Sequence, residues 1–185
     1  MPTLEFSTPA DVTPRIAQVR QAAVDSVKAM RLLLDNEPDA LQALRILKFE
    51  EFGHRPLEPR RLNLMEQLNQ SFTYLVSLEA ARWLLAKHPM AGPIRLNLGT
   101  ANGLDLESVA PGQIAAESFA ATRPQSNRKL TKDLDRLHRL GPSVAHRYVF
   151  LSCPNIGEGR QMNLERGDGV EVWSFPVEKV LGEHT

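Results

Sequence analysis

The spacing of apolar residues changes near His88, and this change limits the possible folds more than any other feature of the sequence. Before it, a helical spacing predicts a long helix from about residue 60 or 61 to Lys87, with an apolar face made of Met65, Leu68, Phe72, Leu75, Val76 and Trp83. After it, short apolar or alternating segments are separated by turns that contain glycine and proline. We therefore expect an α+β protein in which a helical half precedes a mixed sheet.

Two more helices are expected before this long helix. In the first, Thr13 would be the N-cap and Pro14 the first helical residue, and the apolar period continues to about Asp35. The second covers about residues 40–52 and is ended by the glycine and proline that follow. Residues 1–9 carry no helical period and are expected to form an extended arm with a short edge strand.

The second half of the chain is expected to combine strands with one central helix. Strands are expected at residues 94–99, 104–108, 113–121, 146–153 and 169–175, a helix between Ser126 and Gly141, and a short terminal helix at 176–182. With the long helix they give the order helix, three strands, helix, strand. We expect residues 1–58 to form an N-terminal helical extension that could serve as a homodimer surface, and residues 59–185 to form the core.

Composition places the chain among folded, water-soluble proteins. Apolar residues make up 42% and charged residues 24% of the sequence, and the formal net charge is zero. No overall field therefore attracts nucleic acid or an anionic membrane, although a local basic patch is compatible with this balance. The single cysteine, Cys153, excludes an internal disulfide framework and is expected to be a half-buried structural thiol. Because no apolar run approaches about 18 residues, we expect a cytoplasmic protein without a membrane segment.

Three carboxylates are the candidates for chemistry. Asp105 and Glu117 lie on two consecutive expected strands, which would be only about 5 Å apart in a hairpin. Glu79 falls at the centre of the apolar face of the long helix, where a carboxylate is costly unless it is paired or bound to a cation. The simpler alternatives are a salt bridge from Glu79 to an arginine of a neighbouring element, and a solvated strand face that carries Asp105 and Glu107. Alanines flank Glu117, which indicates a tightly packed strand where a carboxylate is conspicuous.

Polar and basic residues surround the start of the helix that follows the third strand. Those able to contact the phosphates of DNA or RNA are Arg123, Asn127, Arg128, Lys129 and Lys132, and the alternative is an ordinary solvated helix face. Asp133 and Arg136 of the same helix are expected to point outward or toward the sheet edge. The histidines His138 and His146 lack the spacing of a metal site and are expected to be structural.

The order of elements and the three acids resembles the PD-(D/E)XK phosphodiesterases, the restriction-endonuclease-like superfamily. LEAARWLL resembles its helix motif with Glu79 as the acid, GLDLES the strand motif with Asp105, and AAESFA the third motif with Glu117. The resemblance covers roughly residues 60–152, about half of the chain. It implies a nuclease-like enzyme in which Mg²⁺ or Mn²⁺ is held by Asp105 and Glu117, with Glu79 completing the shell, and activates a water.

One departure from the superfamily leaves the activity open. Phe119 stands where the superfamily has a lysine, and a phenylalanine can neither orient nor deprotonate a water. Some members supply the basic residue from the next helix, as Lys129 or Lys132 could do here. The sequence is thus compatible with a metal-dependent endonuclease or exonuclease that uses Lys129, with a noncatalytic module that binds nucleic acid or protein, and with an unrelated α+β protein.

Overall fold

The computed structural model describes residues 3–54, 56–57, 61–98 and 103–182. Its helices are α1 (Pro9–Asn36), α2 (Ala40–Phe49), α3 (Leu64–Lys87), α4 (Lys129–Leu140) and α5 (Val177–Leu181). Its strands are β1 (Thr3–Phe6), β2 (Gly53–His54), β3 (Arg61–Leu62), β4 (Ile94–Asn97), β5 (Leu106–Ser108), β6 (Ile114–Ala120), β7 (His146–Ser152), β8 (Gly159–Arg160) and β9 (Val170–Ser174). Short 3-10 turns are η1 (Ser126–Arg128), η2 (Gly141–Ser143) and η3 (Met162–Leu164).

In the described part of the chain, seven strands form one mixed sheet in the order β1-β4-β5-β6-β7-β9-β8. Strands β1, β4, β5 and β6 run antiparallel to one another in turn, whereas β6, β7 and β9 are parallel. The short β8, which the sequence did not indicate, returns antiparallel to β9. The expected α+β class, with helices at the N-terminus and a mixed sheet, is confirmed.

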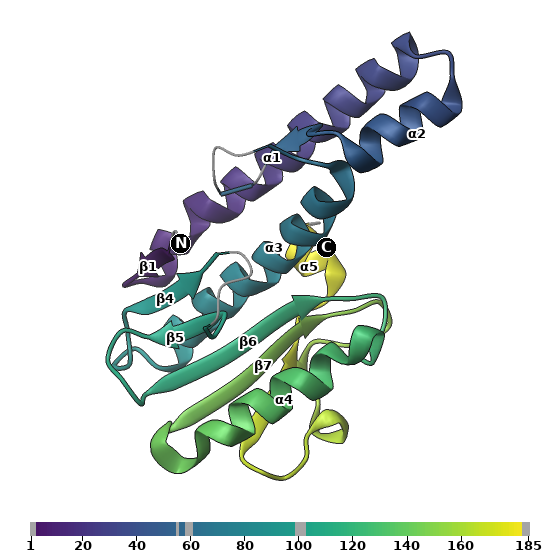
Figure 1. Ribbon diagram of the computed structural model, residues 1–185. Coiled ribbons are helices and arrows are strands. Elements are labelled where there is room, and N and C mark those ends of the chain that lie inside the picture. The colour runs from purple at the N-terminus through teal and green to yellow at the C-terminus, as the bar shows by residue number, and fades with distance from the viewer. Residues whose placement is uncertain (1–2, 55, 58–60, 99–102, 183–185) are drawn as a thin grey trace.

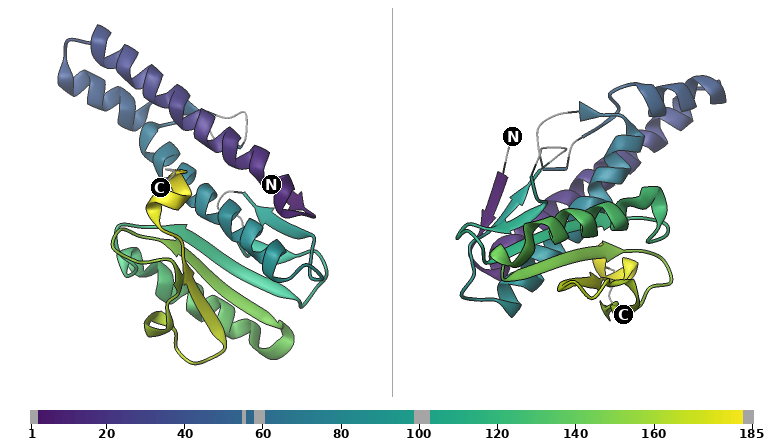
Figure 2. Two further views of the ribbon diagram at one scale, coloured as in Figure 1. Left: turned by 180° about the vertical axis from the view of Figure 1, so that it is seen from behind. Right: turned by 60° about the horizontal axis from the view of Figure 1, so that its bottom comes forward.

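Helices cover both faces of the sheet (Figure 1). α1, α3 and α5 lie over one face and α4 lies over the other, as two further views show (Figure 2). Successive residues of β6 therefore enter different cores: Ala116 is buried under α3, and Ala115 is buried under α4. By the same alternation Ser118 belongs to the α3 face and Glu117 to the α4 face.

The N-terminal residues share the core of the rest of the chain. Phe6, Val12, Ile16 and Val19 are buried in one cluster with α3 and the central strands, and β1 forms an edge of the sheet. The far half of α1 and the whole of α2 project beyond the sheet as a hairpin (Figure 1). The segment expected as an extension, residues 1–58, thus supplies part of the core as well as this hairpin.

α1 begins at Pro9, five residues earlier than the start expected at Pro14. Thr8 is the N-cap, and the Asp11 carboxylate accepts hydrogen bonds from the backbone N–H groups of Thr8 and Ser7 at 2.8 and 3.0 Å. This carboxylate three residues after the N-cap supplies one half of a capping box. The later Thr-Pro pair has no acid at the same distance, so the helix runs through it.

The first turns of α3 are more exposed than the apolar spacing predicted. Met65, Leu68 and Phe72 are 50%, 43% and 37% exposed, whereas Leu75 and Val76 are buried. The first turns of α3 extend past the sheet toward the hairpin of α1 and α2 (Figure 1). The apolar face expected on α3 is therefore only partly buried in the core, since among the described residues its first turns are not covered by the sheet.

None of the helices in the described ranges is both long and apolar enough to span a membrane. The thiol of Cys153 is fully buried under α4, deeper than the half-buried position expected, and burial raises its pKa. His138 lies 3.0 Å from a carboxylate oxygen of Asp168, a surface contact consistent with a structural role.

Candidate functional site

A cavity of about 340 Å³ opens beside β6, between α3 and α4. Within the described residues β5 pairs only with Ala115 and Ala116 of β6, so the second half of β6 lacks a strand neighbour on this side. Three of the four residues expected to be catalytic line the cavity, namely Asp105, Glu117 and Lys129. They come from the turn before β5, from β6 and from the first residue of α4, so the fold brings together residues that are distant in the chain.

Asp105 takes the place of a strand partner for β6. Its Oδ2 accepts a hydrogen bond from the backbone N–H of Ser118 at 2.8 Å and lies 3.4 Å from the Ser118 hydroxyl. The backbone carbonyl of Asp105 accepts from the Asn97 N–H at 2.9 Å, which ties the turn to β4. These hydrogen bonds fix the carboxylate where the strands separate, and those to Ser118 use only one of its two oxygens.

Glu117 is a fully buried carboxylate, with a relative exposure of 0%. Arg136 of α4 places its Nη1 2.9 Å from Glu117 Oε1, but neither carboxylate oxygen has an aligned hydrogen-bond donor among the described residues. Burial, together with the negative charges of Asp105 and Asp133, raises the pKa of Glu117 to about 8. Arg136 and Lys129 oppose this shift without cancelling it.

Lys129 and Asp133 form a second charged pair one turn apart on α4. Lys129 Nζ donates to Asp133 Oδ1 at 2.8 Å. Asp133 is 4% exposed, its Oδ2 has no hydrogen-bond partner in the described part of the chain, and burial raises its pKa to about 6. Burial alone would lower the pKa of Lys129. The hydrogen bond to Asp133 and the negative charges of Asp133, Asp105 and Glu117 have a larger opposite effect, so the pKa is raised and the amine stays charged.

Asp133 and Arg136, which were expected to point outward or toward the sheet edge, face the cluster, and Asp133 is buried there. The apolar side chains Leu130, Leu134 and Leu137 seat α4 on the sheet. Asp133 precedes Leu134 on α4, and both side chains are buried between this helix and the sheet. The polar cluster therefore contains three carboxyl groups and two basic groups.

Glu79 does not reach this cavity. It lines a different cavity of about 730 Å³ with residues of α1 and α5, and Arg82 Nη2 donates to its Oε2 at 2.5 Å. Ser77, which lines the cavity of Asp105, is two residues earlier and about 200° away around the helix. The expectation that all three acids share one pocket is not met. Glu79 has the salt bridge to an arginine that was the alternative, but this arginine, Arg82, belongs to the same helix and not to a neighbouring element.

The residues expected to bind phosphates lie outside the cavity. Arg123, Asn127, Arg128 and Lys132 are exposed, and none of them lines it. Asn127 and Arg128 have φ angles of 53° and 56°, in the left-handed region that non-glycine residues seldom adopt. They form the turn that starts α4 at Lys129. Their role toward nucleic acid stays a prediction.

A polar face of α3 lines the cavity and was missed in the sequence. It consists of uncharged residues at helical spacing: Asn69, Gln70, Thr73, Tyr74 and Ser77. Ser77 shares a hydrogen bond of 2.7 Å with the Ser118 hydroxyl and so joins α3 to β6. The signal was available, because five uncharged polar side chains on one face of a helix indicate a hydrophilic space beside it.

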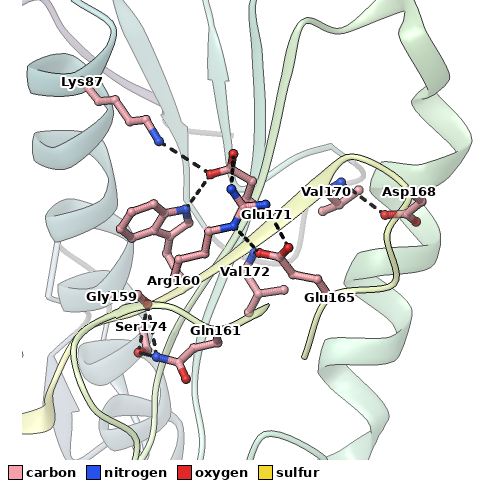
Figure 3. A network of polar contacts seen from close by, with 11 residues as sticks. Lys87, Gly159, Arg160, Gln161, Glu165, Asp168, Val170, Glu171, Val172 and Ser174 are labelled. Atoms are coloured by element: carbon pink, nitrogen blue, oxygen red, sulfur yellow. Dashed lines mark hydrogen bonds and ion pairs between the residues drawn. The ribbon is translucent and has the colours of Figure 1, made fainter. Parts of the chain in front are cut away.

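A second polar network at the β8 edge of the sheet provides a comparison (Figure 3). Arg160 donates to both oxygens of Glu165 at 2.8 and 2.9 Å and to Glu171 at 3.0 Å. Glu171 also accepts from Trp173 Nε1 at 2.8 Å and lies 3.6 Å from Lys87 Nζ. Here Glu165 and Glu171 each have an aligned donor, which is the pattern of a structural network, in contrast to the buried Glu117 beside α4.

The acids of the cavity suit a hard cation. In the described ranges, no three side chains of histidine, cysteine, aspartate or glutamate are placed to hold a metal ion together. Mg²⁺ is usually held by one or two carboxylates and several waters. Asp105 uses one oxygen toward Ser118, and both oxygens of Glu117 are buried without an aligned donor. The donor chemistry of this pair therefore fits Mg²⁺ or Mn²⁺.

The molecule is an α+β protein whose mixed sheet carries a cluster of acids and bases where β5 and β6 separate, and two of the acids, Glu117 and Asp133, are buried. Comparison with protein-family models, with curated proteins and with solved structures gives no match to this chain. Its function must therefore be inferred from its own residues.

Proposed function

We propose that this chain is a Mg²⁺-dependent nuclease with a PD-(D/E)XK core that hydrolyses phosphodiester bonds of DNA or RNA. The observation that carries the proposal is the meeting of Asp105, Glu117 and Lys129 in one cavity. Two carboxylates and one lysine are the group that the superfamily uses, here with the lysine supplied by the helix after the third strand. The element order of α3, β4, β5, β6, α4 and β7 also supports this reading.

In this mechanism each residue of the cavity has a distinct task. Asp105 and Glu117 would hold the metal ion, which lowers the pKa of a bound water and offsets charge on the phosphoryl oxygens. Lys129, held by Asp133, stays protonated and would orient the attacking water or donate a hydrogen bond to the phosphate. The uncharged face of α3 closes the other side of the cavity and would contact the sugar or base next to the phosphate.

The alternative is a noncatalytic module on the same fold that binds nucleic acid or protein. Phe119 favours it, because this side chain is 3% exposed and packs in the core under α4, where it offers no chemistry. Both proposals use the same cavity. They differ in whether Lys129 replaces the missing lysine in the reaction or only neutralises Asp133.

Cleavage assays with the purified chain test the enzyme. Labelled single-stranded and double-stranded DNA and RNA are incubated with Mg²⁺ or Mn²⁺, and products are resolved by electrophoresis. Lys129→Met is expected to lose on the order of 10²- to 10⁴-fold in rate, since it removes a group that acts on the water. Lys132→Met is the matched control, because Lys132 is exposed on the same helix outside the cavity. Absence of cleavage with every substrate and both metals rules out the nuclease and leaves the binding module.

We further propose that the protein works in the cytoplasm and pairs with a second copy through its N-terminal helices. Large apolar side chains are exposed on the projecting hairpin of α1 and α2, namely Leu32, Leu41, Leu44 and Phe49. Such side chains are typical of surfaces that a partner covers. Sedimentation velocity of the purified chain measures its mass, and a monomer at high concentration would exclude the dimer.

A further inference from the structure

We propose that the guanidinium group of Arg136 stands in for the divalent cation at Glu117, and that binding of the metal displaces it. This inference rests on the proposed function, since it uses Glu117 as a metal ligand. It adds that Arg136 is a competitor that sets metal affinity, in place of a fixed part of the catalytic group.

The contact between Arg136 and Glu117 is close but poorly aligned. Nη1 lies 2.9 Å from Oε1, yet the carboxylate lacks an aligned donor on either oxygen within the described residues. By contrast, Arg160 makes aligned hydrogen bonds to both oxygens of Glu165. A two-point arginine–carboxylate pair is strong and directional, whereas the Arg136 contact supplies charge with little directional bonding. Displacing it forfeits few hydrogen bonds.

Arg136 also has space to move. Its side chain is 38% exposed, while that of Glu117 is 0% exposed, so the cation reaches in from solvent to a carboxylate that stays inside. Once Glu117 is ionised, as a metal ligand must be, its buried carboxylate needs a positive partner whether or not a metal is present. The arginine meets this need in the metal-free protein, and a divalent ion meets it better with twice the charge.

Asp133 provides the position to which the arginine can move. It lies three residues before Arg136 on α4, a spacing at which helix side chains are neighbours. Its Oδ1 accepts from Lys129, but its buried Oδ2 has no hydrogen-bond partner in the described residues. With the metal at Glu117 and Asp105, Arg136 can turn to Asp133 Oδ2, so every acid of the cluster keeps a cation.

Isothermal titration calorimetry of the whole 185-residue chain with Mn²⁺ tests the displacement. Arg136→Gln removes the competitor and is expected to bind Mn²⁺ about tenfold more tightly than the unmodified protein. Arg136→Lys keeps the positive charge and is expected to stay within about threefold of it. The matched control is Arg139→Gln, because Arg139 is exposed one turn further along α4; its affinity should not change.

Thermal unfolding gives a second readout without any activity measurement. In a chelator, Arg136→Gln is expected to melt at a lower temperature than the unmodified protein, because Glu117 loses its cation. Added Mn²⁺ should raise the Tm of this variant more than that of the unmodified protein, since the ion binds only the folded state. If the variant is unfolded in chelator, Mn²⁺ is expected to restore its helical circular dichroism.

The outcomes separate the two proposals. Equal or weaker Mn²⁺ binding by Arg136→Gln overturns the displacement and leaves the nuclease intact, and so does a failure of Mn²⁺ to stabilise the variant more than the unmodified protein. Absence of Mn²⁺ binding in every variant overturns both. Tighter binding by Arg136→Gln that is lost when Glu117→Gln is added supports both, because it locates the competition at that carboxylate.

Discussion

Glu117 and Glu79 are both buried carboxylates with an arginine partner, but their surroundings differ. They are 0% and 4% exposed, and the nearest guanidinium nitrogens lie at 2.9 and 2.5 Å. Arg82 is three residues from Glu79 on the same helix and donates a hydrogen bond to it. Arg136 comes from a different element than Glu117 and does not align with it.

The difference teaches that burial alone does not identify a site. Glu79 is stabilised by its own helix, so nothing else in the molecule needs to be arranged around it. Glu117 depends on the packing of α4 against β6, and it lies in the electrostatic field of two more carboxyl groups, Asp105 and Asp133. Several like charges held together in a buried place cost free energy, and such an arrangement is typical of sites that bind a cation or move a proton.

The largest expected effect concerns activity. Glu117→Gln keeps the shape of the side chain but removes a metal ligand, so the cleavage rate is expected to fall by on the order of 10²- to 10⁴-fold. Glu79→Gln makes the same chemical change at the other buried carboxylate and is expected to leave the rate within a few-fold. Initial rates with Mn²⁺ and a nucleic-acid substrate measure both variants.

Similar losses of cleavage rate in the two variants would contradict the expected difference between Glu117 and Glu79. Equal losses would mean that Glu79 acts on the reaction from its separate cavity, as the sequence resemblance first implied. Circular dichroism spectra of both variants check that neither loss comes from unfolding.

The fold was predictable from the sequence wherever apolar spacing reflected contact with the sheet. The order of α3, the three strands and α4 follows from that spacing and from the turns between them. Apolar spacing did not predict that Met65, Leu68 and Phe72 are exposed, because it identifies an apolar helix face but not whether another element covers that face. The start of α1 was missed because two Thr-Pro pairs look alike unless the acid after the first is included.

The candidate site was only partly predictable. Asp105 and Glu117 were found because each occupies a motif position, and Lys129 because it lies on the next helix, from which a substitute for the motif lysine could come. The structure brings all three to one cavity. Glu79 was assigned to it because a helical period shows that a side chain faces inward but not which of two packed surfaces it meets. The roles of Asp133 and Arg136 could not be found, since they depend on how closely α4 packs against β6.

The second expected effect is a dependence of stability on pH that belongs to Glu117. Its pKa is raised from 4.5 to about 8, so between these values the native protein holds a proton that the unfolded chain has lost. The folded state then binds more protons than the unfolded state, and stability falls as the pH rises through this range. The expected loss is on the order of a few kcal/mol between about pH 5 and about pH 8.

Urea unfolding at several pH values measures this dependence. Glu117→Gln cannot titrate at this position and should show a shallower fall, with the remainder due to Asp133, whose pKa is raised to about 6. Glu79→Gln keeps Glu117 and should keep its share of the fall. A slope unchanged by Glu117→Gln would mean that its carboxyl group is ionised in the folded protein across this range.

The smallest expected effect is at the local pair of Glu79. Arg82→Gln removes the donor, but the Arg82 side chain is 41% exposed, so the pair lies near solvent and its loss is partly compensated by water. We expect a loss of about 1 kcal/mol in the free energy of unfolding. A double-mutant cycle with Glu79→Gln isolates the interaction between the two side chains. A coupling of several kcal/mol would contradict the comparison, because Glu79 would then depend on its arginine as strongly as a fully desolvated carboxylate does.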